Sequence, residues 1–264
     1  MMFSAEQHES FNTVGYVRLE GAVPSSDVRE MYGRIWSLLE EKGFNQDDSS
    51  TWKPGPAGAL HELKKGEFAP NDSPVVRAAL DAVFEGSQRE QPTSWGQPLA
   101  TFPDKDGPWL LPNNIWHFDH PYSLPGEISG VNVFLFIDDV EPEGGGTVVV
   151  RSSPSLVERM RASAPRIEKI SDLNKAFLRS HPWLKGLKTG KKFRSVERNQ
   201  HYMAQDTDID GIAARVVELT GKAGDVFLCH PALCHAPAPN VADRPRLMRT
   251  QRVRRIRNSA RAEE

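Results

Sequence analysis

Residues 129–140 read SGVNVFLFIDDV, and this stretch decides the fold. From Val131 to Ile137 nearly every side chain is apolar, and most of these are β-branched or aromatic. A strand with one solvated face alternates polar and apolar residues, so a nearly continuous apolar run predicts a strand covered on both faces. The sequence therefore predicts a layered protein with this strand inside a sheet.

Further short runs of the same character lie on both sides of this strand. They are rich in β-branched and aromatic residues and are separated by Gly and Pro, which favours strands over helices. They cover residues 14–21, 95–103, 114–120, 146–152, 214–221, 224–230 and 246–253. Two helices are predicted near the N-terminus, an amphipathic one at 24–43 and another from Ser73-Pro74 to about residue 86.

This order of elements predicts a mainly β protein, a barrel or two-sheet sandwich backed by N-terminal helices. We expect a single domain over residues 1–264, with helical support in 1–93 and core strands in 94–153 and 206–257. Residues 154–205 interrupt the strands and read as helix and loop, so they are predicted to form a helical insertion.

The composition is ordinary for a globular protein, with 38% hydrophobic residues, 26% charged residues and a formal net charge of −2. This balance does not indicate nucleic acid or a membrane surface as a partner. The arginine-rich segment 245–264 lacks interleaved aromatic residues, so we interpret it as a strand and a solvated tail. The polar N-terminus has no signal-peptide core, and two cysteines make no disulfide framework, so a cytoplasmic location is expected.

The first candidate site is WHFDH at residues 116–120. In a strand, residues two positions apart point to the same face, so His117 and Asp119 are predicted to project together and His120 away from them. One further nitrogen would complete a face of two His and one carboxylate, which leaves positions open on Fe(II) for a cosubstrate and O₂. An ordinary hydrogen-bonded pair is the alternative.

The second candidate is LCHPALCHAPAPN at residues 228–240, which holds both cysteines of the chain. A structural zinc site would need a second Cys/His cluster, and no cysteine is left for one. Cys229 and Cys234 are therefore interpreted as apolar core residues, and the residues alone do not choose between His230 and His235. Eleven residues after His235 comes Arg246, which is suited to bidentate binding of a carboxylate or is simply a surface arginine.

Together these segments resemble the phytanoyl-CoA dioxygenase family, a branch of the Fe(II)- and 2-oxoglutarate-dependent oxygenases. Residues 14–35 are similar to the family's opening strand and helix, HFD matches its H-x-D motif, and 136–150 and 223–246 are similar to its later segments. The resemblance implies a double-stranded β-helix with the iron at its mouth. It also implies that Fe(II) is held by His117, Asp119 and His235, and that Arg246 binds the distal carboxylate of 2-oxoglutarate.

The activity that the resemblance implies is a dioxygenase reaction with Fe(II), 2-oxoglutarate and O₂. A small organic molecule would be hydroxylated at an unactivated C–H bond, with release of succinate and CO₂. Because Asp119 is present, halogenation is disfavoured, whereas desaturation, epimerisation and ring formation stay open. The alternatives from other classes are a non-enzymatic ligand-binding barrel and a zinc hydrolase with the same three ligands.

The chain departs from the family pattern at the cosubstrate site. The family often has a small hydroxyl residue two positions after the distal histidine, where this chain has Pro237. Polar side chains that could replace it are Gln97, Asn132, Thr147 and Thr250.

The substrate is less defined than the cosubstrate. Trp116 and Tyr122 flank the H-x-D motif and are candidates for lining the substrate pocket. The insertion 154–205 is expected to lie over the barrel mouth as a lid. Its lysines and arginines would suit an anionic substrate or form a solvated helix face.

Overall fold

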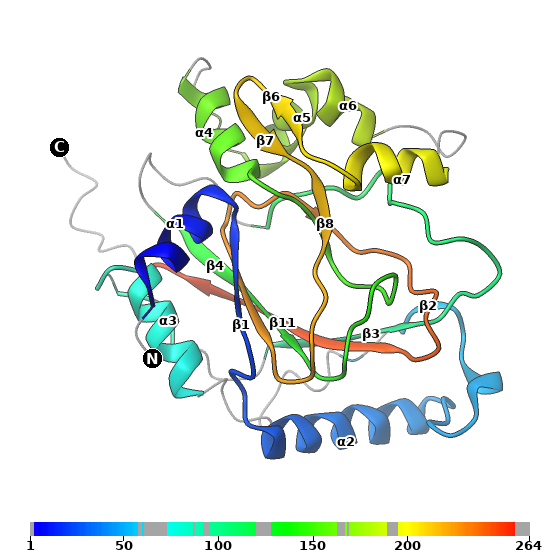
Figure 1. Cartoon of the computed structure of the whole chain (residues 1–264). Coiled ribbons are helices and arrows are strands. Elements are labelled where there is room, and N and C mark those ends of the chain that lie inside the picture. Colours follow the sequence, from blue (N-terminus) through cyan, green and yellow to red (C-terminus); the bar gives the residue numbers. More distant parts are fainter. Residues whose placement is uncertain are drawn as a thin grey trace.

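The computed structural model describes residues 3–57, 60, 73–86, 88–91, 96–119, 128–162, 167, 169–188 and 195–256, and Figure 1 draws the chain. Its large sheet has six antiparallel strands, which are, in spatial order, β1 (Tyr16–Leu19), β9 (Val226–Cys229), β4 (Gly130–Phe136), β11 (Arg246–Arg254), β3 (Gln97–Phe102) and β2 (Gly55–Pro56). Three helices precede or flank it, α1 (Ala5–Thr13), α2 (Ser25–Glu41) and α3 (Pro74–Val83), together with the 3₁₀ turn η1 (Ser49–Thr51).

Strand β4 is the strand that the apolar run predicted, and all of its residues are buried. Val131, Val133 and Leu135 lie on one face of the sheet and pack in a core shared with the three N-terminal helices. Phe134 and Phe136 lie on the other face, in a second core. Both faces are therefore covered, which is why the run does not alternate.

A small sheet faces the second core. It consists of β10 (His235–Ala236), β5 (Val148–Val150) and β8 (Val216–Glu218), in this order. Val149 points toward the large sheet and packs in one cluster with Phe134 and Met248. Its neighbours Val148 and Val150 point the other way, into a third core. The alternation shows that the small sheet is also covered on both faces.

The helical insertion covers the outer face of the small sheet. Its helices are α4 (Ser153–Ala162), α5 (Ile170–Arg179), α6 (Pro182–Leu187) and α7 (Val196–Met203), and a hairpin of β6 (Thr207–Ile209) and β7 (Ile212–Ala214) follows. Figure 1 shows these helices gathered at the top, on the side opposite α2. Phe177 and Trp183 pack in one cluster with Val216. The molecule thus has four layers: helices, large sheet, small sheet, helices.

One arginine of the insertion, Arg198, has a structural role. Arg198 of α7 is buried, and its guanidinium donates to the carbonyl oxygens of Leu111, Pro112 and Leu187. The described helices of the insertion therefore back the small sheet as α2 and α3 back the large one. A lid over the barrel mouth stays a prediction. None of the helices in the described ranges has the length and apolar character needed to span a membrane.

The segment 114–120 is not the regular strand that its composition predicted. Up to Asp119, where the described part ends, His117 alone pairs with another segment, through a bridge to His235. The backbone N–H of Phe118 is instead bound by the side chain of Asn174, at 2.9 Å. Because the N–H of Phe118 points away from the His235 segment, a side chain takes the place of a neighbouring strand on that side.

The sequence prediction also lacks helix α1. This helix buries only Phe11, so its apolar periodicity is weak. The sequence does carry a start signal, because Ser4 and Gln7 form a capping box with both reciprocal hydrogen bonds. The helix could therefore have been predicted from its cap but not from its face.

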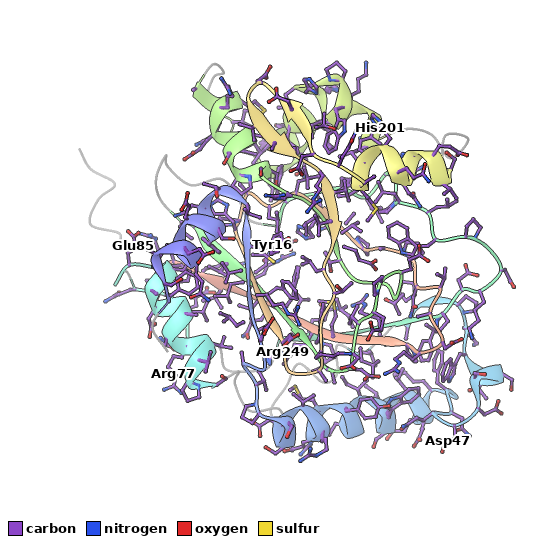
Figure 2. All side chains as sticks on the ribbon, viewed as in Figure 1. Tyr16, Asp47, Arg77, Glu85, His201 and Arg249 are labelled. Carbon is purple, nitrogen blue, oxygen red and sulfur yellow. The ribbon has the colours of Figure 1, made fainter. Side chains whose placement is uncertain are left out.

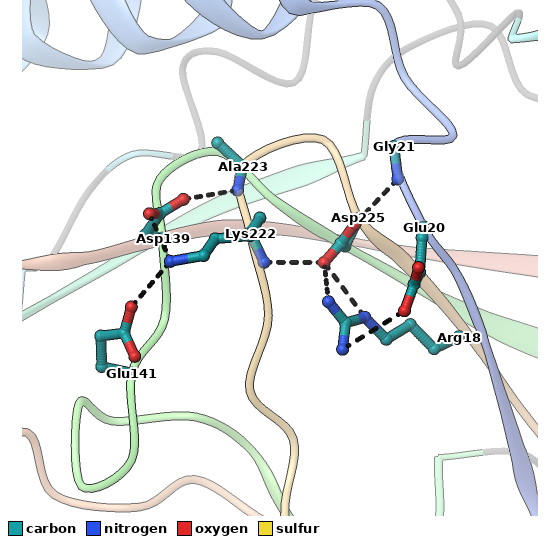
Figure 3. Close-up of polar contacts among 8 residues, drawn as sticks. All are labelled: Arg18, Glu20, Gly21, Asp139, Glu141, Lys222, Ala223 and Asp225. Atoms are coloured by element: carbon teal, nitrogen blue, oxygen red, sulfur yellow. Dashed lines mark hydrogen bonds and ion pairs between the residues drawn. The ribbon is translucent and has the colours of Figure 1, made fainter.

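A buried carboxylate joins two segments at one end of the large sheet (Figure 3). Asp225, just before β9, accepts hydrogen bonds from the Arg18 guanidinium at 2.6 Å, the Gly21 N–H at 2.8 Å and the Lys222 N–H at 2.7 Å. Its side chain is only 3% exposed. The carboxylate therefore fixes the end of β1 against the turn that leads into β9.

We expect Asp225→Ala to lower the free energy of unfolding by roughly 3 kcal/mol, because the buried carboxylate that accepts all of these hydrogen bonds is lost. Glu20→Ala is the matched control. Glu20 also pairs with Arg18, but at 3.8 Å and with a mostly exposed side chain, so its loss should change stability by less than about 0.5 kcal/mol. Urea denaturation of both variants measures the difference. Equal effects of the two substitutions would contradict the assigned role of Asp225.

Candidate metal and cosubstrate site

His117, Asp119 and His235 meet between the two sheets. Their potential ligand atoms all lie within 4.8 Å of one another. Asp119 Oδ1 is 3.6 Å from His117 Nε2, and Asp119 Oδ2 is 3.3 Å from His235 Nε2. The backbones of His117 and His235 exchange two hydrogen bonds, of 2.9 and 3.0 Å. This bridge brings together two segments that are more than a hundred residues apart in the sequence.

Backbone carbonyl groups fix the orientation of both imidazoles. His117 Nδ1 lies 2.8 Å from the Ile115 carbonyl oxygen, and His235 Nδ1 lies 2.9 Å from that of Leu233. A carbonyl oxygen only accepts, so each Nδ1 carries a proton, and Nε2 is the ring nitrogen of each histidine that is directed at the cluster. Burial, and next the neighbouring His235, lowers the pKa of His117, which favours the neutral form that binds metals.

The carboxylate of Asp119 is held from the other side by two donors. Asn132 Nδ2 donates to Oδ2 at 3.0 Å, and the guanidinium of Arg252 donates to Oδ1. Burial opposes ionisation of Asp119, but His235 and Arg252 outweigh it and hold the pKa of the carboxyl below its usual range. The three side chains thus present two imidazole nitrogens and one carboxylate, the donor set of a divalent metal with open positions.

A cavity of about 570 Å³ opens in front of these ligands. Its lining includes Gln97, Thr147 and Thr250, three of the polar residues predicted to assist the cosubstrate, and also Pro237. Asn132, the fourth, lies against Asp119 instead. The contacts that these residues would make with a cosubstrate stay predictions.

Arg246 lines the same cavity from β11. The residue is 5% exposed, and its Nη2 donates to Thr101 Oγ1 at 2.5 Å. Its Nε and Nη1 are buried and have no hydrogen-bond partner among the described residues. Burial lowers the pKa of the guanidinium to about 10. A buried cation with unused donors is unfavourable by itself, so this site is suited to an anion.

The second buried arginine of β11 faces the opposite way. Arg249 is three residues further along the strand and is 1% exposed, and Figure 2 shows it in the interior of the ribbon, whereas Asp47 and Arg77 lie at the periphery. Its Nη2 donates to Gln251 at 3.0 Å, and it is not among the described residues that line the cavity. Strand parity therefore distinguishes the two arginines.

Thr101 is a contact that the sequence did not predict. It lies directly opposite Arg246 in the antiparallel pairing of β3 with β11. Both strands are predicted from composition, but which residues pair depends on the register, and no motif marks Thr101. Its hydroxyl reaches the guanidinium from β3, whereas the family's hydroxyl residue would come from the position of Pro237.

His230 lies outside the metal cluster. Its Nδ1 accepts a hydrogen bond from the Ala232 N–H at 3.0 Å, and its ring packs on Phe11 with centroids 5.2 Å apart. Cys229 and Cys234 are both buried, and burial raises the pKa of each thiol. The interpretation of the two cysteines as core residues is confirmed.

Trp116 does not contribute to the cavity in the way the sequence suggested. It is buried in the core between the small sheet and the insertion, and its indole N–H donates to the Pro112 carbonyl oxygen at 3.0 Å. It is absent from the described cavity lining. Tyr122, the other candidate for substrate contact, and His120 lie outside the described residues.

A glutamate holds the loop that leads to Thr147. Glu218 of β8 accepts hydrogen bonds from the backbone N–H groups of Glu143, at 2.7 Å, and Gly146, at 2.9 Å. A Cβ at Gly146 would lie 2.2 Å from the Leu219 carbonyl oxygen, so only glycine permits this approach. Burial, with the charge of Glu143 adding, raises the pKa of Glu218 from 4.5 to about 7.

This shift predicts a pH-dependent stability. Between pH 4.5 and 7 the folded protein keeps a proton on Glu218 that the unfolded chain releases, so rising pH favours unfolding. We expect the stability difference between wild type and Glu218→Gln to move against the wild type by roughly 2–3 kcal/mol across this window. Denaturation of both proteins from pH 4.5 to 8 measures it. A difference that stays constant, or moves the other way, would refute the assignment.

Comparison with known families places most of the chain in one group. The family model described as Phytanoyl-CoA dioxygenase (PhyH) matches residues 11–248. The matched range contains His117, Asp119, His235 and Arg246. A comparison with curated protein sequences found no significant match.

Solved structures share the fold at low sequence identity. The epimerase SnoN, in complex with Fe³⁺, alpha ketoglutarate and nogalamycin RO, is 16% identical with a TM-score of 0.51, over 94% of this chain and 82% of that one. The non-heme alpha ketoglutarate dependent carbocyclase SnoK is 15% identical with a TM-score of 0.52, over 96% and 84%. AviO1 from Streptomyces viridochromogenes Tue57 is 14% identical with a TM-score of 0.50, over 95% and 94%. The expected mainly β, double-stranded β-helix fold is confirmed.

Proposed function

Because the chain belongs to the phytanoyl-CoA dioxygenase family, we propose that it is an Fe(II)- and 2-oxoglutarate-dependent oxygenase that hydroxylates an unactivated C–H bond of a small organic molecule. One observation carries this proposal. A single cavity contains both a two-His-one-carboxylate donor set and a buried guanidinium with unpartnered donors. The first suits a divalent iron, and the second suits the far carboxylate of a dicarboxylic acid.

The residues present fit the metal. His117 and His235 would bind it through Nε2, since both Nδ1 atoms are occupied by carbonyl groups. Asp119 would add a carboxylate oxygen and one negative charge. When bound, Fe(II) supplies the oxidation, in which 2-oxoglutarate, O₂ and a C–H bond give succinate, CO₂ and a C–OH group.

Arg246 would bind the distal carboxylate of 2-oxoglutarate through Nε and Nη1. Thr101 holds the remaining end of the guanidinium, so the fork is already oriented. Because the site is buried, the ion pair would form in a low dielectric, where it is stronger than at the surface. Gln97, Thr147 and Thr250 are proposed as further polar contacts of the cosubstrate.

The surrounding residues would fix the ligands and exclude water. Asn132 and Arg252 hold Asp119 in place, as partners behind metal ligands commonly do. Leu99, Phe134 and Met248 form the apolar part of the cavity wall. A zinc hydrolase would use the same three ligands but would have no role for the buried Arg246, so we favour the oxygenase.

The proposal is tested by succinate release from 2-oxoglutarate, with a substrate panel analysed by mass spectrometry. Turnover should require Fe(II) and O₂ and should stop when Zn(II) replaces Fe(II). Hydroxylation adds one oxygen atom to the product, desaturation removes two hydrogens, and epimerisation leaves the mass unchanged. Turnover with Zn(II), or without 2-oxoglutarate, would overturn the proposed activity. A product without added oxygen would overturn the hydroxylation alone.

A further inference from the structure

A second arginine of β11 lies at the metal cluster. Arg252 lines the cavity, and its side chain is 50% exposed. It lies directly opposite Asn132 in the pairing of β11 with β4, and both side chains donate to the carboxylate of Asp119. The bond to Asp119 uses Nη2, and a guanidinium has further donors on Nε and Nη1. Arg252 can therefore hold Asp119 and bind another acceptor at the same time.

Arg252 and Arg246 are too far apart to bind the same small anion. Both side chains belong to the cavity-lining face of β11, but six residues separate them. Six residues of strand span about 20 Å. A molecule of 2-oxoglutarate that reaches from the metal ligands to Arg246 extends away from Arg252. The two arginines thus mark two ends of the cavity, with the metal ligands near the Arg252 end.

When a divalent metal and 2-oxoglutarate occupy the site, no other group there balances the positive charge of Arg252. Among the described lining residues, Asp119, Arg246 and Arg252 carry formal charges, and a histidine binds a metal ion as the neutral imidazole. A divalent ion and Arg246 together balance the charges of Asp119 and the 2-oxoglutarate dianion. Since the metal ion also competes with Arg252 for the carboxylate of Asp119, the attraction between those two residues weakens when the site fills. One positive charge then remains at the substrate side.

We propose that Arg252 binds a carboxylate of the substrate, so that the enzyme acts on small carboxylic acids with an apolar body. A carboxylate fits this position because it is a monoanion and matches the guanidinium fork. The apolar body follows from Leu99, Phe134 and Met248 in the same wall. This inference rests on the proposed function, since the charge balance assumes a bound divalent metal and 2-oxoglutarate.

The test uses binding without turnover. Protein saturated with Zn(II) and 2-oxoglutarate is titrated with hexanoate and hexanamide, and with benzoate and benzamide, in ligand-observed NMR experiments. Saturation with 2-oxoglutarate keeps the probes away from Arg246. We expect at least one carboxylate to bind tenfold or more tightly than its amide. Arg252→Gln should abolish this preference. Arg254→Gln, which removes a charge from an exposed position of the same strand outside the cavity lining, should keep it.

Three results would overturn the inference. The first is that neither pair favours the carboxylate, and the second is that Arg252→Gln keeps the preference. If Arg252→Gln does not bind Zn(II), the preference for the carboxylate is measured in Arg252→Lys instead. A preference as strong as that of the wild type in this variant is the third contradicting result. Calorimetry of 2-oxoglutarate binding to the Zn(II) protein separates these results from failure of the proposed function. If the wild type does not bind 2-oxoglutarate, the function itself is wrong and the inference falls with it.

Discussion

Replacing His235 by alanine is expected to abolish metal binding and turnover, whereas replacing His230, five residues earlier, should preserve both. His235 points its Nε2 at Asp119 from a distance of 3.3 Å, and its ring is fixed by the Leu233 carbonyl. His230 uses its Nδ1 for a local bond to Ala232 and packs on Phe11. Loss of a group behind a metal ligand costs 10- to 100-fold in affinity, so loss of a ligand should cost more than roughly 100-fold.

The pair of variants is matched in chemistry and in sequence position. Metal content after dialysis and the Kd for Co(II), a spectroscopic substitute, can be measured without a substrate. His230→Ala should lower the melting temperature through lost packing but bind metal as the wild type does. If His230→Ala loses the metal and His235→Ala retains it, the ligand assignment is wrong.

Arg246→Met should have opposite effects on stability and on cosubstrate binding. Removing one partner of a buried ion pair weakens binding by roughly 2–5 kcal/mol, which is a loss of about 30-fold or more in affinity for 2-oxoglutarate. In the ligand-free protein the same guanidinium is buried and lowers stability, as its depressed pKa of about 10 indicates. The apo variant should therefore be more stable than the wild type, by about 1–3 kcal/mol.

Arg244→Met is the control for this prediction. Arg244 is two residues away, and its largely exposed side chain lies 3.7 Å from Asp138. Its replacement should leave both quantities nearly unchanged. Calorimetry with 2-oxoglutarate and urea denaturation without it provide the two measurements. An Arg246→Met protein that binds 2-oxoglutarate normally would show that the arginine serves another ligand.

The layers of the fold could be predicted because buried elements show a recognisable apolar pattern in the sequence. The nearly unbroken apolar run at Val131–Ile137 required cover on both faces, and β4 has it. Helix α1 has no such apolar pattern, since it buries only Phe11. The prediction of a regular strand at 114–119 was wrong. The composition of this segment favours a strand, but the side chain of Asn174, distant in the sequence, accepts a hydrogen bond from the backbone N–H of Phe118.

The site could be predicted in part. The H-x-D spacing brings His117 and Asp119 together, but the choice of His235 over His230 depended on the family resemblance. Thr101 and Arg252 could not be found from the sequence, because their roles come from the register of β11 with β3 and β4. Composition predicts that strands exist, whereas pairing depends on the packing of the whole molecule.

Fe(II) and 2-oxoglutarate are proposed to bind together at His117, Asp119 and His235. Anaerobic addition of 2-oxoglutarate to the Fe(II) protein tests it most directly, since chelation of the metal by the keto acid produces a visible charge-transfer band and no substrate is needed. We predict a band that saturates with 2-oxoglutarate, weakens in Arg246→Met and is absent in His235→Ala. No band in the wild type, or an unchanged band in His235→Ala, would show that the metal and 2-oxoglutarate do not bind together at these residues.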